Sequence, residues 1–203
     1  MVRLFSLLCF ILFGVYDSIQ SEKSGGSRCL KPFLMPALIV FYLSSASSVQ
    51  WLLAAALVFD WAGDVFLMSR RHRALLAGVI SFGIGHVLRI LLFVQQGLVF
   101  DDVVVLVMFM MAAYGWSVLN RIRFPLPVIR NVCLGYGGVL CLMSVAACMA
   151  MRGGGSVLSW IGSLLFVYSD SLIGLKEWGG DSGHGIMETY LIGQFLIVLG
   201  VLL

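Results

Sequence analysis

The chain has 203 residues, of which 61% are hydrophobic and 11% are charged, whereas about 25% of the residues of ordinary soluble domains are charged. A soluble fold of this size cannot bury so much apolar surface, so the composition excludes a soluble globular domain and predicts an all-α polytopic membrane protein. The net charge of +3 does not indicate a nucleic-acid partner, because the basic residues form short groups between apolar runs without interleaved aromatic residues.

Eight apolar runs follow one another along the chain, and we interpret each as a transmembrane helix of a single domain covering residues 1–203. The first run could also be a signal peptide, since Arg3 precedes it and a polar stretch follows. Pro32 suits the first turn of the second helix. The predicted spans are residues 2–16, 32–48, 49–68, 74–94, 99–119, 128–151, 156–175 and 186–203.

The distribution of Lys and Arg predicts the orientation, because these residues gather in cytoplasmic loops. One side of the membrane would carry ten of them and the other side only Arg3 and Arg152, with Arg89 inside a span. The ten-residue side is therefore predicted to be cytoplasmic, with both termini on the opposite side. The same bias favours residues 2–16 as a span over a cleaved signal peptide. The ten residues are Lys23, Arg28, Lys31, Arg70, Arg71, Arg73, Arg121, Arg123, Arg130 and Lys176.

Two aspartates stand out because they lie inside spans, Asp64 in the third and Asp170 in the seventh. An aspartate at the centre of a transmembrane helix costs roughly 2.5 to 3.5 kcal/mol even on the lower scales, so such residues are usually functional. Each lies about five residues from the predicted cytoplasmic end of its span, or roughly 7 to 8 Å at about 1.5 Å per residue. Because both spans run in the same direction, we expect the two acids to share a depth and to meet. The structural alternative is a buried carboxylate that caps a helix or pairs with a cation such as Arg89.

Four further polar residues and Lys31 are candidates for the same site. Asp60 lies one helical turn from Asp64 and is either a second site residue or a water-facing neighbour. His86 could donate a proton or orient a phosphate, or it could be a satisfied core residue. Tyr190 and Gln194 are spaced i, i+4 in the last span, where polar groups often only join helices. Lys31, at a predicted cytoplasmic helix start, could bind a phosphate or extend its amine to the lipid headgroups.

Two rival functions fit the same residues. An intramembrane metal hydrolase would use Asp60, Asp64, Asp170 and His86, but a zinc site usually has more nitrogen or sulfur ligands, so we predict neither a metal nor a cofactor. A proton-coupled transporter or lipid-binding protein would use the acids without catalysis. Serine hydrolase and ATP-driven functions lack support, because the chain has no GxSxG, no phosphate-binding glycine loop and no HExxH.

Several short motifs, in this order and each in its own span, resemble the YhhN-type lysoplasmalogenase family of eight-span membrane proteins. The similarity extends over about residues 28–200. The motifs are Lys31-Pro32 with Pro36, Phe59-x4-Asp64 with Gly63, His86, Ser169-Asp170, and Thr189-Tyr190-x3-Gln194-x-Leu196. The chain departs from the family at Arg89 and Leu191, where tyrosines are common, at Lys176, where an asparagine is usual, and at Asp60, which is more often serine.

The resemblance implies hydrolysis of the vinyl ether bond of lysoplasmalogens to a fatty aldehyde and a glycerophospho-ethanolamine or glycerophospho-choline, with Asp64 and Asp170 as the catalytic pair. Such hydrolysis needs an acid to protonate the alkene carbon and a water molecule to attack the oxocarbenium ion. Two carboxylates can divide this work, as in glycoside hydrolysis, and which one is the acid stays open. The partners would be a lysophospholipid, its phosphate near Lys31, Arg89 or Lys176, and the lipid bilayer, with a homo-oligomer as an open alternative.

Overall fold

The computed structural model describes residues 1–23, 30–69, 72–181 and 183–203. The regular secondary structure of these residues is entirely α-helical. This result confirms the predicted all-α class. Of the basic residues used to predict the orientation, Arg28, Arg70 and Arg71 lie outside the described residues. The helices in the described residues are α1 (Val2–Lys23), α2 (Lys31–Ser45), α3 (Trp51–Leu67), α4 (His72–Gln95), α5 (Asp102–Arg121), α6 (Pro127–Arg152), α7 (Val157–Trp178) and α8 (Ile186–Leu202).

Within the described residues, five helices are long and apolar enough to cross a membrane. They are α1, α4, α5, α6 and α7, whereas α2 and α8 are shorter apolar helices. Many of their large apolar side chains are exposed, among them Leu106 and Phe109 of α5. A soluble protein would bury such a surface, so its exposure is typical of helices that face lipid. The chain is therefore a helical membrane protein.

The first helix is longer than the sequence predicted, because α1 continues to Lys23 instead of ending near residue 16. Hydropathy marks where a chain leaves the hydrocarbon, which need not be where the helix ends. Residues 17–23 are mostly polar but contain neither Gly nor Pro, so nothing in them interrupts the hydrogen-bonding pattern.

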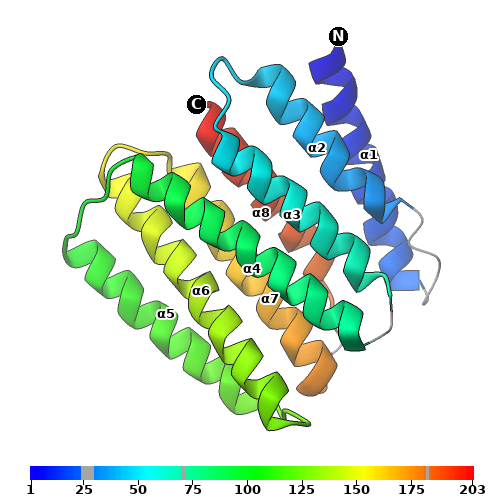
Figure 1. The fold of residues 1–203 in the computed structure, drawn as a ribbon, viewed down its shortest axis with the longest axis vertical. Coiled ribbons are helices and arrows are strands. Elements are labelled where there is room, and N and C mark those ends of the chain that lie inside the picture. Colours follow the sequence, from blue (N-terminus) through cyan, green and yellow to red (C-terminus); the bar gives the residue numbers. More distant parts are fainter. Residues whose placement is uncertain (24–29, 70–71, 182) are drawn as a thin grey trace. The chain divides into compact units, whose positions relative to one another are not determined.

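The chain divides into two compact units, residues 1–92 and 93–201, with the last two residues shared between them. In the first unit α2 packs against both α1 and α3 (Figure 1). Helices α3 and α4 approach closely at Gly63, where a Cβ atom would lie only 2.7 Å from the ring of Phe82. Gly63 therefore admits the Phe82 ring next to Asp64. The prediction of a single transmembrane domain stays a prediction.

In the second unit α6 packs against α5 and α7 (Figure 1). The backbones of α7 and α8 nearly touch, since a Cβ atom on Gly162 would lie 2.6 Å from the carbonyl oxygen of Gly193. Small residues that allow two helices to pack this closely are common in membrane proteins. This contact sets the position of α8 against α7, the helix that carries Asp170.

Candidate active site

The first candidate carboxylate, Asp64, forms an ion pair with Lys31. The Lys31 Nζ atom lies 3.0 Å from the Asp64 Oδ1 atom, and the two side chains are only 9% and 3% exposed. Lys31 is the first residue of α2, and Asp64 lies in the last turn of α3. The pair thus joins two neighbouring helices through opposite charges that are both removed from the surface.

A second contact next to this pair fixes the start of α2. Pro32 lies in the first turn of α2, as predicted, and Pro36 lies one turn further on. Proline has no N–H group, so Pro36 cannot donate to the carbonyl of Pro32 as a helical residue normally would. The indole Nε1 atom of Trp61 donates to that carbonyl oxygen instead, at 2.9 Å. Trp61 lies one turn before Asp64, so this bond holds Lys31 near its carboxylate partner.

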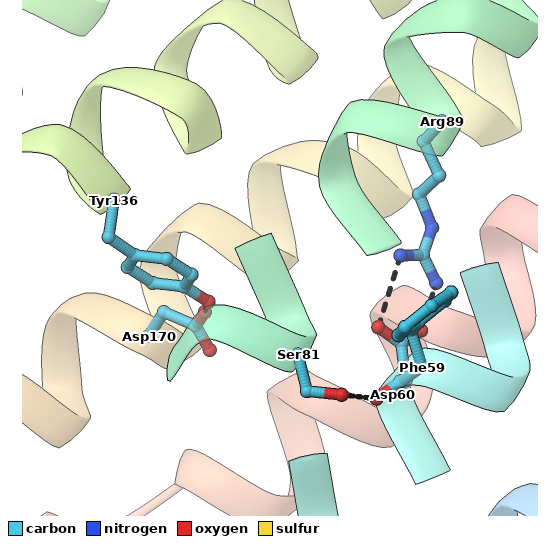
Figure 2. A network of polar contacts seen from close by, with 6 residues as sticks. All are labelled: Phe59, Asp60, Ser81, Arg89, Tyr136 and Asp170. Carbon is cyan, nitrogen blue, oxygen red and sulfur yellow. Dashed lines mark hydrogen bonds and ion pairs between the residues drawn. The ribbon is translucent and has the colours of Figure 1, made fainter. Parts of the chain in front are cut away.

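Asp60, one turn before Asp64 on α3, forms a second ion pair with Arg89 of α4. Both side chains are fully buried, and two guanidinium nitrogens face the two carboxylate oxygens (Figure 2). The Nη1 atom of Arg89 lies 3.3 Å from the Oδ1 atom of Asp60. Gly85 makes room for the pair, because a Cβ atom there would lie 2.7 Å from Asp60 Oδ1. The water-facing alternative for Asp60 is therefore wrong.

Two other buried polar side chains lie on α4. His86 is fully buried one turn before Arg89. Ser81 donates from its hydroxyl to the carbonyl oxygen of Phe59 at 2.6 Å, which ties α4 to α3 a second time (Figure 2). Together with Gly63 and Gly85, these contacts align α4 along the acidic face of α3.

The second candidate carboxylate, Asp170 of α7, accepts a hydrogen bond from the phenol of Tyr136 on α6 (Figure 2). Asp170 and Tyr136 are both partly buried. Sequence reasoning did not find Tyr136, since it lies in an apolar span among small residues such as Gly135 and Gly137. The signal in the sequence is the hydroxyl itself, because a tyrosine hydroxyl inside a span needs a hydrogen-bond partner.

The neighbours of Asp170 along α7 and α8 are the remaining predicted site residues. Ser169 is fully buried and donates to the carbonyl oxygen of Ile186 at 2.9 Å, joining α7 to the start of α8. Tyr190 and Phe166 form an edge-to-face aromatic pair, with ring centroids 5.3 Å apart. Phe166 lies one turn before Asp170 on α7. Gln194 is fully buried one turn after Tyr190.

The predicted site residues thus form two groups, one in each unit. The first unit contains Lys31, Asp60, Asp64 and His86, and the second contains Ser169, Asp170, Tyr190 and Gln194. That Asp64 and Asp170 meet stays a prediction. Among the described residues no three His, Cys, Asp or Glu side chains gather as a metal-binding group.

These features define the class of the protein: it is a polytopic helical membrane protein with buried ionisable side chains on its helices. The sequence model of the YhhN family matches residues 26–201. The chain belongs to the YhhN family, as its motifs predicted. No curated protein and no solved structure gives a significant match to the chain.

Proposed function

We propose that the protein is a membrane-embedded hydrolase that cleaves the vinyl ether bond of lysoplasmalogens. Membership of the YhhN family supports hydrolase activity of this kind. The observation that carries the proposal is that each intramembrane aspartate has a chemically suited partner on the neighbouring helix. Asp64 is paired with the Lys31 ammonium group, and Asp170 accepts from the Tyr136 hydroxyl. Ionisable side chains inside membrane helices usually mark functional sites, and these two contacts fix the positions of both carboxyl groups.

The reaction divides into two steps, of which the first needs a protonated carboxyl group and the second an ionised one. In the first step a carboxylic acid transfers its proton to the alkene carbon that is not bonded to oxygen, leaving an oxocarbenium ion. In the second step a water molecule attacks the cationic carbon and gives a proton to a carboxylate, and the hemiacetal then separates into aldehyde and glycerophospholipid alcohol. We propose that Asp64 and Asp170 supply these two groups, by the division of labour known from glycosidases.

The lysophospholipid would enter with its aliphatic chain between the helices and its phosphate at one end of them. Three cations are candidates for the phosphate. Arg89 is fully buried in its ion pair with Asp60, and Lys31 is buried in its ion pair with Asp64. Lys176, in contrast, is exposed in the last turn of α7. We therefore propose Lys176 as the phosphate contact. Lys176→Gln should raise the KM for the lysophospholipid without lowering kcat, and an unchanged KM would remove Lys176 from this role.

The orientation that places Lys176 at the cytoplasmic face is also a proposal. Its support is that Arg73, Arg121, Arg123 and Arg130 are exposed at helix ends or in connections on the predicted cytoplasmic side. A membrane-impermeant thiol reagent would support it if it labels Arg123→Cys only from the cytoplasmic side, in a background whose native cysteines are replaced by serine. Labelling only from the opposite side would reverse the orientation.

The experiment that tests the function is aldehyde release by the purified protein in detergent. An alkenyl lysophospholipid is compared with its acyl counterpart, and Asp64→Asn and Asp170→Asn serve as variants. The proposal requires aldehyde from the alkenyl lipid and its loss in both variants, each folded as judged by helix content. Absence of aldehyde with folded natural protein would contradict hydrolysis and favour a transporter or lipid-binding protein using the same acids.

A further inference from the structure

The Lys31 side chain does not take the usual course of a lysine at the end of a membrane helix. Such lysines extend along the apolar surface to bring their ammonium group to water or to headgroups. Lys31 instead points to the adjacent helix, where its Nζ atom lies 3.0 Å from Asp64 Oδ1 and its side chain is 9% exposed. The Trp61 bond to the Pro32 carbonyl holds the backbone next to Lys31 in this position. The ammonium group of Lys31 is thus buried in an ion pair with a carboxylate and does not reach the surface.

The other acid of α3 is paired with a different base. Asp60 precedes Asp64 by one turn, and its carboxylate is bound on both oxygens by Arg89. The third ionisable group, His86, lies one turn before Arg89 on α4 and is fully buried. Each of the two acids of α3 is therefore matched with its own base. In a low-dielectric setting an ammonium group at hydrogen-bonding distance strongly favours the ionised form of a carboxyl group.

We propose that Lys31 is a positioning residue that keeps Asp64 ionised, so that Asp64 is the carboxylate that stabilises the oxocarbenium ion and takes a proton from the attacking water. This inference rests on the proposed function and extends it by assigning the two roles. The O–H bond that breaks in the first step then belongs to Asp170, and its proton forms the new C–H bond of the alkene carbon. The proton that Asp64 receives from water returns to Asp170 through solvent, which balances the cycle.

The first test reads the charge of Asp64 without using activity. The infrared difference spectrum between the natural protein and Asp64→Asn should show the loss of an ionised carboxylate band. Loss of a protonated carboxyl band would overturn the proposal. Lys31→Met should create a protonated carboxyl band that is absent when Lys31→Met is combined with Asp64→Asn. Arg130→Met, which removes an exposed cation to which no role in the site is assigned, is the control and should create none.

The second test separates positioning from phosphate binding by kinetics. Lys31→Gln should lower kcat by roughly 100-fold, the lower end of the usual effect of acid–base groups, and leave KM unchanged. Lys31→Arg retains the charge and should restore part of kcat. A raised KM at constant kcat would assign Lys31 to the phosphate and overturn the proposal. If the natural protein releases no aldehyde, the proposed function fails, whereas the infrared result still decides the charge of Asp64.

Discussion

The indole nitrogen of Trp61 replaces, at the carbonyl oxygen of Pro32, the helical donor that Pro36 lacks. The bond is 2.9 Å long and joins α3 to the first turn of α2. Because Lys31 precedes Pro32 and Asp64 follows Trp61 by three residues, the same two turns carry the buried ion pair. A proline that would ordinarily weaken a helix is thus used here to free an acceptor for a neighbouring helix.

This relationship predicts that the effect of removing the indole depends on which residue stands at position 36. Trp61→Phe should reduce the free energy of unfolding by about 1 kcal/mol, the usual net contribution of one hydrogen bond. In a Pro36→Ala background the restored backbone N–H can donate to the Pro32 carbonyl, so the same change should cost almost nothing. Denaturing-detergent titration of the four proteins measures this double-mutant cycle. Equal costs in both backgrounds would contradict the interpretation, and Trp51→Phe, at a residue that is 73% exposed, is the control.

The buried pair of Asp60 and Arg89 predicts a large penalty for removing one partner. Arg89→Met leaves an uncompensated buried carboxylate and should destabilise the protein by about 3–5 kcal/mol. The double replacement Asp60→Ser with Arg89→Tyr introduces residue types that are common at these positions in the YhhN family. It removes both charges together and should recover most of that loss. Denaturing-detergent unfolding measures both. A double variant less stable than Arg89→Met would show that the charges themselves stabilise the fold.

Tyr136 should affect the rate more than substrate binding, because its hydroxyl contacts Asp170. Tyr136→Phe removes only that oxygen and should lower kcat roughly 2- to 10-fold, since a hydrogen bond to an uncharged group contributes about 0.5–1.5 kcal/mol. Tyr168→Phe is the matched control, because Tyr168 lies on the same helix as Asp170 and is 47% exposed. Equal kcat values for the two variants would remove Tyr136 from the active site.

A pH effect is predicted at Asp101, which caps α5 just before the candidate span Asp102–Arg121 and binds Arg152 at the end of α6. Partial desolvation raises the pKa of Asp101, but the Val104 amide and the Arg152 guanidinium together outweigh it, and the net pKa is lowered. A group with a lowered folded-state pKa stabilises fully above its unfolded value, about 3.9, and loses this contribution as the pH falls through the folded value.

Asp101→Asn should therefore lower the unfolding temperature at neutral pH, and the difference from the natural protein should shrink below about pH 4. Asparagine is itself a good N-cap, so the comparison isolates the charge. Thermal unfolding in detergent over a pH series measures it. A difference that grows as the pH falls would contradict the sign of the pKa shift.

The sequence predicted the helices well because apolar runs and their polar interruptions mark the spans directly. The error at the end of α1 arose because polarity indicates where a chain leaves the membrane and not where a helix stops. Pro32 and Pro127 each lie in the first turn of a helix in the structure, which agrees with the preference of proline for that position.

The candidate site was harder to predict, because partner choice depends on how helices are rotated. The sequence predicted that Lys31 and Asp64 both lie near the cytoplasmic ends of their spans. It left both a phosphate and the lipid headgroups open as partners of Lys31. Arg89 could be foreseen as a counter-ion, but its choice of Asp60 depends on Gly85, whose missing side chain admits the carboxylate. Tyr136 was missed because a single hydroxyl in an apolar span carries almost no periodic signal.

The measurement that tests two-carboxylate hydrolysis most directly is the deuterium content of the aldehyde formed in heavy water. The purified protein is supplied with alkenyl lysophospholipid, the aldehyde is trapped at once, and authentic aldehyde treated identically corrects for exchange. Protonation of the alkene carbon requires one deuterium on the carbon next to the carbonyl, with formation lost in Asp64→Asn and Asp170→Asn. Aldehyde without that deuterium, or formed equally by both variants, would contradict the proposed chemistry.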